Sequence, residues 1–244
     1  MNAKQEALLA EVAALIDEAA HAGHPLHEAL RALYHLHRDE ARRLERQLEK
    51  IIRISDQSQQ MQREMNERLK WLSSHDELTG LYNRRFARAE LDRALRRIVP
   101  GSAAFCLVLA DIDHFKSIND HFGHDVGDKA LAAISACLEH HVGADGLCSR
   151  WGGEEFLLLF PGLGLDATRQ RLQQLHTAVA GIRGVLPDPD RSITVSFGLS
   201  CCQDPGEEGD LLLKRVDLAL YEAKRKGRNR TEAIVVLDTS HALP

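Results

Sequence analysis

The chain has 244 residues, of which 44% are hydrophobic and 27% charged, a globular composition that excludes a disordered or collagen-like chain. Its formal net charge of -5 argues against a general affinity for nucleic acid. The five cysteines show no CxxC spacing, so reduced thiols are expected rather than a disulfide framework or a zinc site. No apolar run reaches about 18 residues and no signal-peptide pattern begins the chain, which predicts a soluble, cytoplasmic protein without a membrane span.

Residues 1–74 have the pattern of helices that need a partner. Residues 26–72 contain neither Gly nor Pro, and apolar positions in the second half recur at alternating steps of four and three. That heptad spacing predicts a coiled-coil stalk over 41–74, preceded by a helical hairpin over 1–40. The stripe consists of Leu44, Leu48, Ile51, Met65, Leu69 and Leu72, with a polar middle at Ser55, Ser58 and Gln62.

Two interpretations of the hairpin stay open at this point. It is either a plain bundle that contacts only a second copy of itself, or a docking platform for a regulatory protein. The stalk is expected to be dimeric in both cases, because a long amphipathic helix cannot bury its own apolar stripe.

Beyond residue 75, helical and strand-like segments alternate. Helices are expected at 84–98, 126–140, 165–182 and 209–226, and strands at 103–110, 147–151, 154–160, 192–200 and 232–237. This mixed order predicts an α+β domain built on a single sheet over 75–236, with a short tail at 237–244.

Three clusters of polar residues carry chemistry. Asp111 ends the apolar strand, where an open sheet usually holds its ligand, and Lys116 follows it. Gly152 and Gly153 permit a tight turn before the adjacent carboxylates of Glu154 and Glu155. A third cluster, Lys224 and Arg228, lies at an expected helix end.

Each cluster alone has an ordinary structural explanation: a solvated turn, an exposed hairpin or a helix cap. Together, acidic and basic groups of this kind are the parts of a metal-assisted phosphoryl or nucleotidyl transfer site. The chain has neither a P-loop sequence nor a G-x-G-x-x-G turn after a strand, so a P-loop or Rossmann fold is not supported.

Residues 75–236 resemble the GGDEF domain of the diguanylate cyclase family. Four ordered motifs carry the resemblance: Asp-Glu-Leu-Thr-Gly-Leu-Tyr-Asn-Arg at 76–84, the segment 111–128 from Asp-Ile-Asp-His-Phe-Lys to Val-Gly-Asp, Arg-Trp-Gly-Gly-Glu-Glu-Phe at 150–156, and Tyr-Glu-Ala-Lys-Arg-Lys-Gly-Arg-Asn at 221–229. The resemblance implies a nucleotidyl-cyclase-like palm, a mostly antiparallel central sheet wrapped by helices. It also implies condensation of two GTP into cyclic di-GMP with release of two pyrophosphates.

The resemblance assigns a role to each matching residue. About two Mg²⁺ or Mn²⁺ ions would lie in each active site. Their implied ligands are Asp111, the backbone carbonyl of Ile112 and Glu154. Glu154 is also the implied proton acceptor, assisted by Glu155. The other implied contacts are Lys116, Lys224 and Arg228 with phosphates, Gly152 and Gly153 along the nucleotide, and Asn119 and Asp128 with guanine, next to His124.

The family resemblance also bears on assembly and control. Each domain is expected to hold one GTP, so two domains must face each other, and the stalk would hold them together as a homodimer. Many family members carry an Arg-x-x-Asp product-inhibition site before the Gly-Gly turn, and here Gly143 and Gly146 replace both charged residues. Little product feedback is therefore expected. The alternative is a catalytically silent GTP-binding or scaffolding module that signals through its partners.

Overall fold

The structure, a computed structural model, describes residues 3–21, 26–98, 105–202, 204 and 206–235. The chain forms two compact units, Met1–Arg68 and Leu69–Pro244. The division expected between residues 74 and 75 stays a prediction. The tail expected at 237–244 lies outside the described residues, as do the ends of the strands expected at 103–110 and 232–237.

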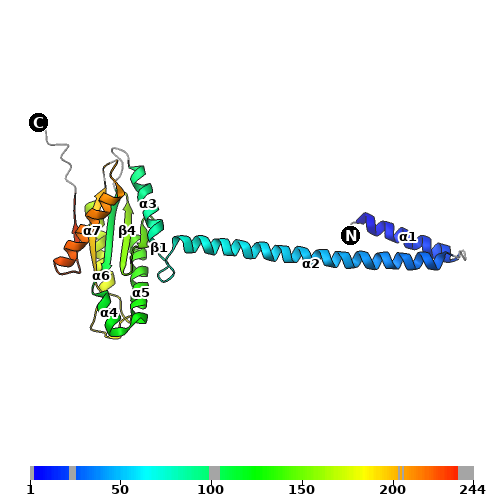
Figure 1. The fold of residues 1–244 in the computed structure, drawn as a ribbon, viewed down its shortest axis with the longest axis horizontal. Helices are drawn as coiled ribbons and strands as arrows, with labels where there is room; N and C mark the ends of the chain where they lie inside the picture. The colour runs from blue at the N-terminus through cyan, green and yellow to red at the C-terminus, as the bar shows by residue number, and fades with distance from the viewer. Residues whose placement is uncertain (1–2, 22–25, 99–104, 203, 205, 236–244) are drawn as a thin grey trace. The chain divides into compact units, whose positions relative to one another are not determined.

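Two helices, α1 (Ala3–His21) and α2 (His27–Ser74), form the N-terminal part of the described chain (Figure 1). Helix α2 runs without a break, as the absence of Gly and Pro predicts. The second arm of the expected helical hairpin and the expected stalk therefore belong to one helix. None of its side chains is buried. Leu44, Leu48, Ile51 and Met65 of the heptad stripe are each more than half exposed. The long helix with an unpaired apolar stripe fits the coiled-coil stalk that the sequence predicts.

The second unit is built on a six-stranded sheet with the order β1-β3-β4-β2-β5-β6. The strands are β1 (Tyr82–Asn83), β2 (Phe105–Ile112), β3 (Leu147–Arg150), β4 (Glu155–Pro161), β5 (Val195–Cys202) and β6 (Thr231–Ala233). The central strand β2 pairs antiparallel with both β4 and β5, whereas the edge pairs β1–β3 and β5–β6 are parallel. The expected mostly antiparallel sheet is confirmed.

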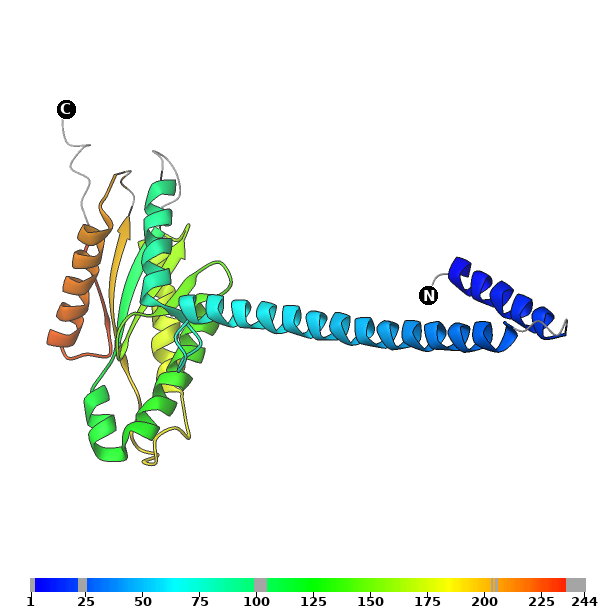
Figure 2. The same cartoon turned by 45° about the vertical axis from the view of Figure 1, so that its right-hand side comes forward.

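Helices cover both faces of this sheet (Figures 1 and 2). They are α3 (Arg84–Arg97), α4 (Phe115–Phe122), α5 (His124–Val142), α6 (Leu165–Ala180) and α7 (Gly209–Arg225). Alternate side chains of β2 enter two separate cores, as strand geometry requires. Leu107 and Leu109 pack with residues of α3 and α7, while Val108 and Ala110 pack with residues of α4, α5 and α6. Because both faces are covered, β2 is buried along its whole length.

Two elements and one covalent bond differ from the sequence-based expectations. Helix α4 and strand β1 were not predicted, because eight and two residues are too short for a periodic pattern. The prediction that all cysteines are reduced is wrong for Cys106 and Cys201, which form a disulfide. These two residues are direct cross-strand partners in β2 and β5, 95 residues apart in sequence, so their spacing along the chain does not reveal the pairing.

A close approach between β5 and α7 gives a stability prediction. An ideal Cβ at Gly198 would lie 2.3 Å from both the Leu220 nitrogen and the Val216 oxygen, and neither backbone atom can rotate away. Gly198→Ala is therefore expected to lower the free energy of unfolding by about 1–3 kcal/mol. Urea denaturation measures this, with Gly164→Ala as the control because a Cβ there meets nothing within 4 Å. Equal stability of the two variants would contradict the prediction.

Candidate active site

Asp111 lies at the carboxyl end of β2, opposite Glu155 of β4 and Ser196 of β5. Only 5% of the residue is exposed, and the Lys224 Nζ atom lies 2.7 Å from its Oδ2 atom. Burial raises the pKa of the Asp111 carboxyl, and the Lys224 ammonium opposes that rise. The structure thus brings together an acid and a base that are more than a hundred residues apart in the chain.

The turn before β4 places Glu154 beside the same strand end. The Ile112 N–H group donates a hydrogen bond to the Glu154 carbonyl oxygen at 3.2 Å. Burial raises the pKa of the Glu154 carboxyl, and the negative charge of Asp111 adds to that rise. The two carboxylates therefore interact in one site.

The donor set at this strand end fits a hard divalent cation. Asp111 and Glu154 offer carboxylate oxygens at this strand end, and Ile112 lies beside them through the hydrogen bond from its N–H to the Glu154 carbonyl. Mg²⁺ is commonly held by one or two carboxylates together with substrate phosphates, so few protein ligands suffice. Across the described residues there is no cluster of three or more His, Cys, Asp or Glu side chains that could hold a metal ion.

The Gly152–Gly153 turn is tight, because the N–H groups of Trp151 and Gly152 both donate to the Glu155 carbonyl oxygen, at 2.8 and 3.1 Å. The Glu155 carboxylate folds back over Gly152. The Glu155 carboxylate therefore lies over the turn, whereas the Glu154 carboxylate interacts electrostatically with Asp111. This difference separates the two adjacent acids that the sequence grouped together.

Asp113 is a site residue to which the sequence analysis gave no role. Its carboxylate accepts hydrogen bonds from the Thr194 and Ser196 hydroxyls, both at 2.7 Å, and from the Asn229 N–H at 3.0 Å. The last of these bonds ties the loop after α7 to the end of β2, and that loop carries Arg228. The positive charge of Arg228 weakly opposes the rise in the pKa of Asp111, so this loop places Arg228 near the site. The second acid of the Asp-Ile-Asp sequence was the available signal.

The expected guanine-binding residues come from two neighbouring helices. Asn119 lies on α4, and Asp128 and His124 lie on α5. An ideal Cβ at Gly127 would lie only 1.9 Å from the Asn119 Oδ1 atom, so the amide packs directly against this glycine. Asp128 follows Gly127 in the chain and is exposed, as are His124 and Lys116. Asn119 therefore packs against the residue that directly precedes Asp128 in the chain.

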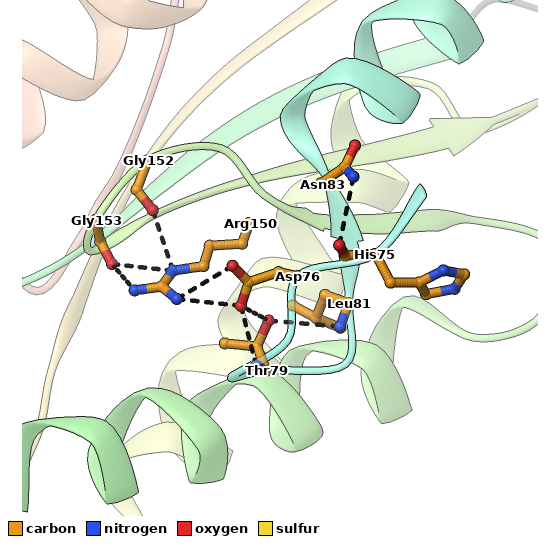
Figure 3. Close-up of polar contacts among 8 residues, drawn as sticks. All are labelled: His75, Asp76, Thr79, Leu81, Asn83, Arg150, Gly152 and Gly153. Carbon is orange, nitrogen blue, oxygen red and sulfur yellow. Dashed lines mark hydrogen bonds and ion pairs between the residues drawn. The ribbon is translucent and has the colours of Figure 1, made fainter. Parts of the chain in front are cut away.

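The side chain of Arg150 binds the backbone of the Gly152–Gly153 turn (Figure 3). Its Nη1 atom lies 3.1 and 3.2 Å from the two carboxylate oxygens of Asp76. Its Nε and Nη2 atoms donate to the carbonyl oxygens of Gly152 and Gly153 at 2.8–3.2 Å. Asp76 and Arg150 lie in two separate sequence motifs, and only the fold shows that they meet.

Residues 73–230 match the family described as diguanylate cyclase, GGDEF domain. The response regulator PleD of Caulobacter vibrioides is 37% identical over 160 residues, which are 65% of this chain and 35% of PleD. Diguanylate cyclase DgcP of Pseudomonas aeruginosa is 40% identical over 157 residues, which are 64% of this chain and 23% of DgcP. The similarity thus extends over about a third or less of these curated relatives.

Two solved structures extend the similarity into the N-terminal helices. The coiled coil and GGDEF domain of DgcB from Caulobacter crescentus, in complex with c-di-GMP, has a TM-score of 0.70 and 32% identity, covering 77% of this chain and 99% of that one. Diguanylate cyclase SiaD from Pseudomonas aeruginosa, in complex with its activator SiaC, has a TM-score of 0.63 and 33% identity, covering 96% and 100%. In the described part of this chain, no helix is both long and apolar enough to span a bilayer. Because the family match spans well over half of the chain, the protein belongs to the GGDEF-domain family of diguanylate cyclases.

Proposed function

We propose that this protein condenses two molecules of GTP into cyclic di-GMP with release of two pyrophosphates. One observation carries the proposal: Asp111, Glu154 and Lys224 converge at the end of β2, with Lys224 Nζ 2.7 Å from Asp111. Two carboxylates and an ammonium group in one partly buried place suit the transfer of a nucleotidyl group. The name of the relative DgcP, diguanylate cyclase, supports the same reaction.

In this reaction the 3′-hydroxyl oxygen of one GTP attacks the α-phosphorus of the other. The bond from that phosphorus to the pyrophosphate oxygen breaks, and the hydroxyl proton passes to the Glu154 carboxylate. Burial and the neighbouring Asp111 raise the pKa of Glu154, which makes its carboxylate a better proton acceptor. Asp111, the Ile112 carbonyl and Glu154 would hold Mg²⁺ or Mn²⁺, which would stabilise the negative charge on the phosphate oxygens.

The basic residues hold the phosphates in this mechanism. Lys224 approaches from the end of α7, and Arg228 from the loop that Asp113 ties to β2. Lys116 projects from α4 as an exposed side chain, without an ion pair among the described residues. Their charges offset the negative charge that develops as pyrophosphate leaves. The Gly152–Gly153 turn lies against the nucleotide, with Glu155 as an assisting acid.

Guanine would be read by Asn119 and Asp128, with His124 at the start of the same helix. A carboxylate accepts hydrogen bonds from the guanine N1–H and 2-amino groups, and adenine has neither donor. The packing of Asn119 against Gly127 supports this pairing, because it holds the amide beside the residue that precedes Asp128.

A homodimer through the stalk completes the proposal. Each domain holds one GTP, so a second copy must bring the other nucleotide. The exposed apolar stripe of α2, including Leu44, Leu48 and Ile51, supplies the surface that a coiled-coil partner would cover. The similar structure of DgcB is described as a coiled coil with a GGDEF domain.

Control by a protein partner on residues 1–74 is the last part of the proposal. SiaD, whose whole chain is covered by the similarity, was solved in complex with its activator SiaC. Within the first unit, α1 and the start of α2 form an apolar groove of about 430 Å³. Its lining includes Leu9, Val12, Leu30, Leu33 and Tyr34. This surface favours the docking-platform interpretation of the hairpin.

Product feedback is expected to be weak. Gly143 and Gly146 replace the charged residues of the inhibitory site, and they form a turn in which the Gly146 N–H donates to the Gly143 oxygen at 3.3 Å. The initial rate at fixed GTP should therefore stay unchanged as cyclic di-GMP is added in excess over the enzyme. Inhibition that disappears on changing residues 143–146 would contradict this prediction.

Mass spectrometry after incubation of purified protein with GTP and Mg²⁺ tests the reaction itself. Cyclic di-GMP from the wild type, and at most about one hundredth of that amount from Glu154→Gln, is the expected result. Protein that binds GTP but yields no product, both alone and with an activating partner bound to residues 1–74, would contradict the proposal. That result would favour the alternative, a catalytically silent GTP-binding or scaffolding module.

A further inference from the structure

The segment 76–85, here called the connector, follows α2 directly and folds around one carboxylate. The Asp76 Oδ1 atom accepts hydrogen bonds from the Thr79 N–H at 3.0 Å and from the Thr79 hydroxyl at 2.8 Å. The Asp76 N–H donates to the Leu81 oxygen at 2.8 Å, which closes the turn. Figure 3 shows this turn beside the Gly152–Gly153 hairpin. The conformation of the connector thus depends on the ionised side chain of Asp76.

Arg150 joins the connector to the β3–β4 hairpin, here called the hairpin, whose turn contains Gly152 and Gly153. Its guanidinium group contacts both carboxylate oxygens of Asp76 on one side and the carbonyl oxygens of Gly152 and Gly153 on the other (Figure 3). The side chains of Arg150 and Asp76 are only 18% and 25% exposed, so water competes weakly for these bonds. A planar guanidinium can hold both partners at once, and a lysine ammonium cannot reproduce that geometry.

The other end of the connector holds the last turn of α2. The Asn83 Nδ2 atom donates to the Ser73 and His75 carbonyl oxygens at 3.0 and 3.3 Å. The Arg85 Nη2 atom donates to the Ser73 Oγ atom at 2.9 Å and also to the Ser73 carbonyl oxygen. The connector therefore contacts both the end of α2 and, through Asp76, the hairpin.

A second contact joins the connector to the β3–β4 hairpin. The guanidinium carbon of Arg84, the first residue of α3, lies 4.6 Å from the centre of the Trp151 ring. Residues near the two ends of the connector, Asp76 and Arg84, thus touch Arg150 and Trp151, which precede the glycine pair. A displacement of the last turn of α2 has a continuous set of polar contacts through which to reach the hairpin.

From this network we propose that Asp76 and Arg150 are positioning residues that fix the hairpin carrying Glu154, and that the connector transmits changes at the end of α2 to this hairpin. The proposal rests on the function proposed above. Glu154 directly follows the two carbonyl groups that Arg150 binds, so loosening them displaces the proposed proton acceptor. A misplacement of about 1 Å can cost about 100-fold in rate.

The charge state of Asp76 supports this role. Burial disfavours its ionised form, yet the hydrogen bonds from Thr79 and the contact with Arg150 outweigh burial and leave the pKa of Asp76 below its ordinary value. The carboxylate therefore stays ionised throughout the neutral range, as an ion pair with Arg150 requires.

The test uses Asp76→Asn and Arg150→Lys in the full-length protein. We expect kcat for cyclic di-GMP formation to fall by about 10- to 100-fold, because the reacting groups lose their alignment. Affinity for a non-hydrolysable GTP analogue should fall much less than kcat, because the proposed guanine contacts of Asn119 and Asp128 lie on other elements. Hydrogen–deuterium exchange should become faster in the peptide 150–156 and stay slow in β2. The matched controls are Asp92→Asn and Arg93→Lys, which alter side-chain ion pairs of α3 outside the network.

Arg85→Ala tests the connection to α2, because the hydrogen bonds of Arg85 go to Ser73 and none goes to the hairpin in the described structure. Faster exchange in 150–156 is expected from this variant as well. Unchanged exchange there would overturn the transmission through the connector. Normal kcat and normal exchange in Asp76→Asn and Arg150→Lys would overturn the positioning role. If the wild type makes no cyclic di-GMP, the proposed reaction fails, and the exchange measurements still decide whether the network holds the hairpin.

Discussion

Replacing Glu154 with glutamine is expected to lower kcat for cyclic di-GMP formation by at least about 100-fold, the contribution of a positioned general base. Glutamine keeps the size of the side chain but cannot accept the 3′-hydroxyl proton and gives a weaker ligand to a divalent cation. The backbone bond between the Ile112 N–H and the residue 154 carbonyl is retained, so the fold at the end of β2 should persist. Initial rates over a range of GTP and Mg²⁺ concentrations measure the effect.

Two further variants make this result specific. Glu139→Gln removes an exposed carboxylate of α5 and should leave the rate unchanged. Glu155→Gln should have a smaller effect than Glu154→Gln, because the Glu155 carboxylate folds over Gly152 whereas Glu154 is coupled to Asp111. A Glu154→Gln enzyme with at least half of the wild-type kcat would remove Glu154 from the mechanism.

Replacing Asp128 with asparagine is expected to raise KM for GTP by about 10- to 100-fold, the factor that corresponds to about 1–3 kcal/mol for an unsatisfied polar group. The asparagine amide offers one acceptor and turns a donor toward the two guanine donors. The interaction is made equally in the ground state and the transition state, so kcat should change far less than KM. Competition experiments should also show a weaker preference for GTP over ATP.

Asp125→Asn is the matched control, because Asp125 is also an exposed acid in the first part of α5. It should leave KM for GTP and the preference for guanine unchanged. An Asp128→Asn enzyme with wild-type KM would show that guanine is read elsewhere. Gly127→Ala offers an independent check, because its Cβ would displace the Asn119 amide.

Much of the fold was predictable because local patterns agree with the tertiary packing. The apolar run before Asp111 became β2, which is buried on both faces and therefore needs apolar residues at every position. Helices α3, α5, α6 and α7 appeared within a few residues of their expected bounds, because each has one apolar stripe toward the sheet. The strand expected at 192–200 begins later, at Val195, and ends at Cys202.

The sequence named candidate site residues, but it did not show how they are arranged. Asp111, Glu154 and Lys224 stood in recognisable motifs, since their chemistry is carried by residue type and local spacing. The difference between Glu154 and Glu155 was not visible in the sequence, because both are glutamates next to the same glycines. Only the turn geometry directs one toward Asp111 and the other over Gly152.

The amino-acid sequence by itself determined the element pattern, the heptad stripe of α2 and the polar motifs, because these are properties of neighbours along the chain. The tertiary structure alone decided which distant residues meet. It paired Cys106 with Cys201, bound Asp113 to Asn229, and joined Asp76 to Arg150, residues 74 positions apart. Such contacts depend on strand order and register, which are set by the packing of the whole sheet and leave no periodic trace in the sequence.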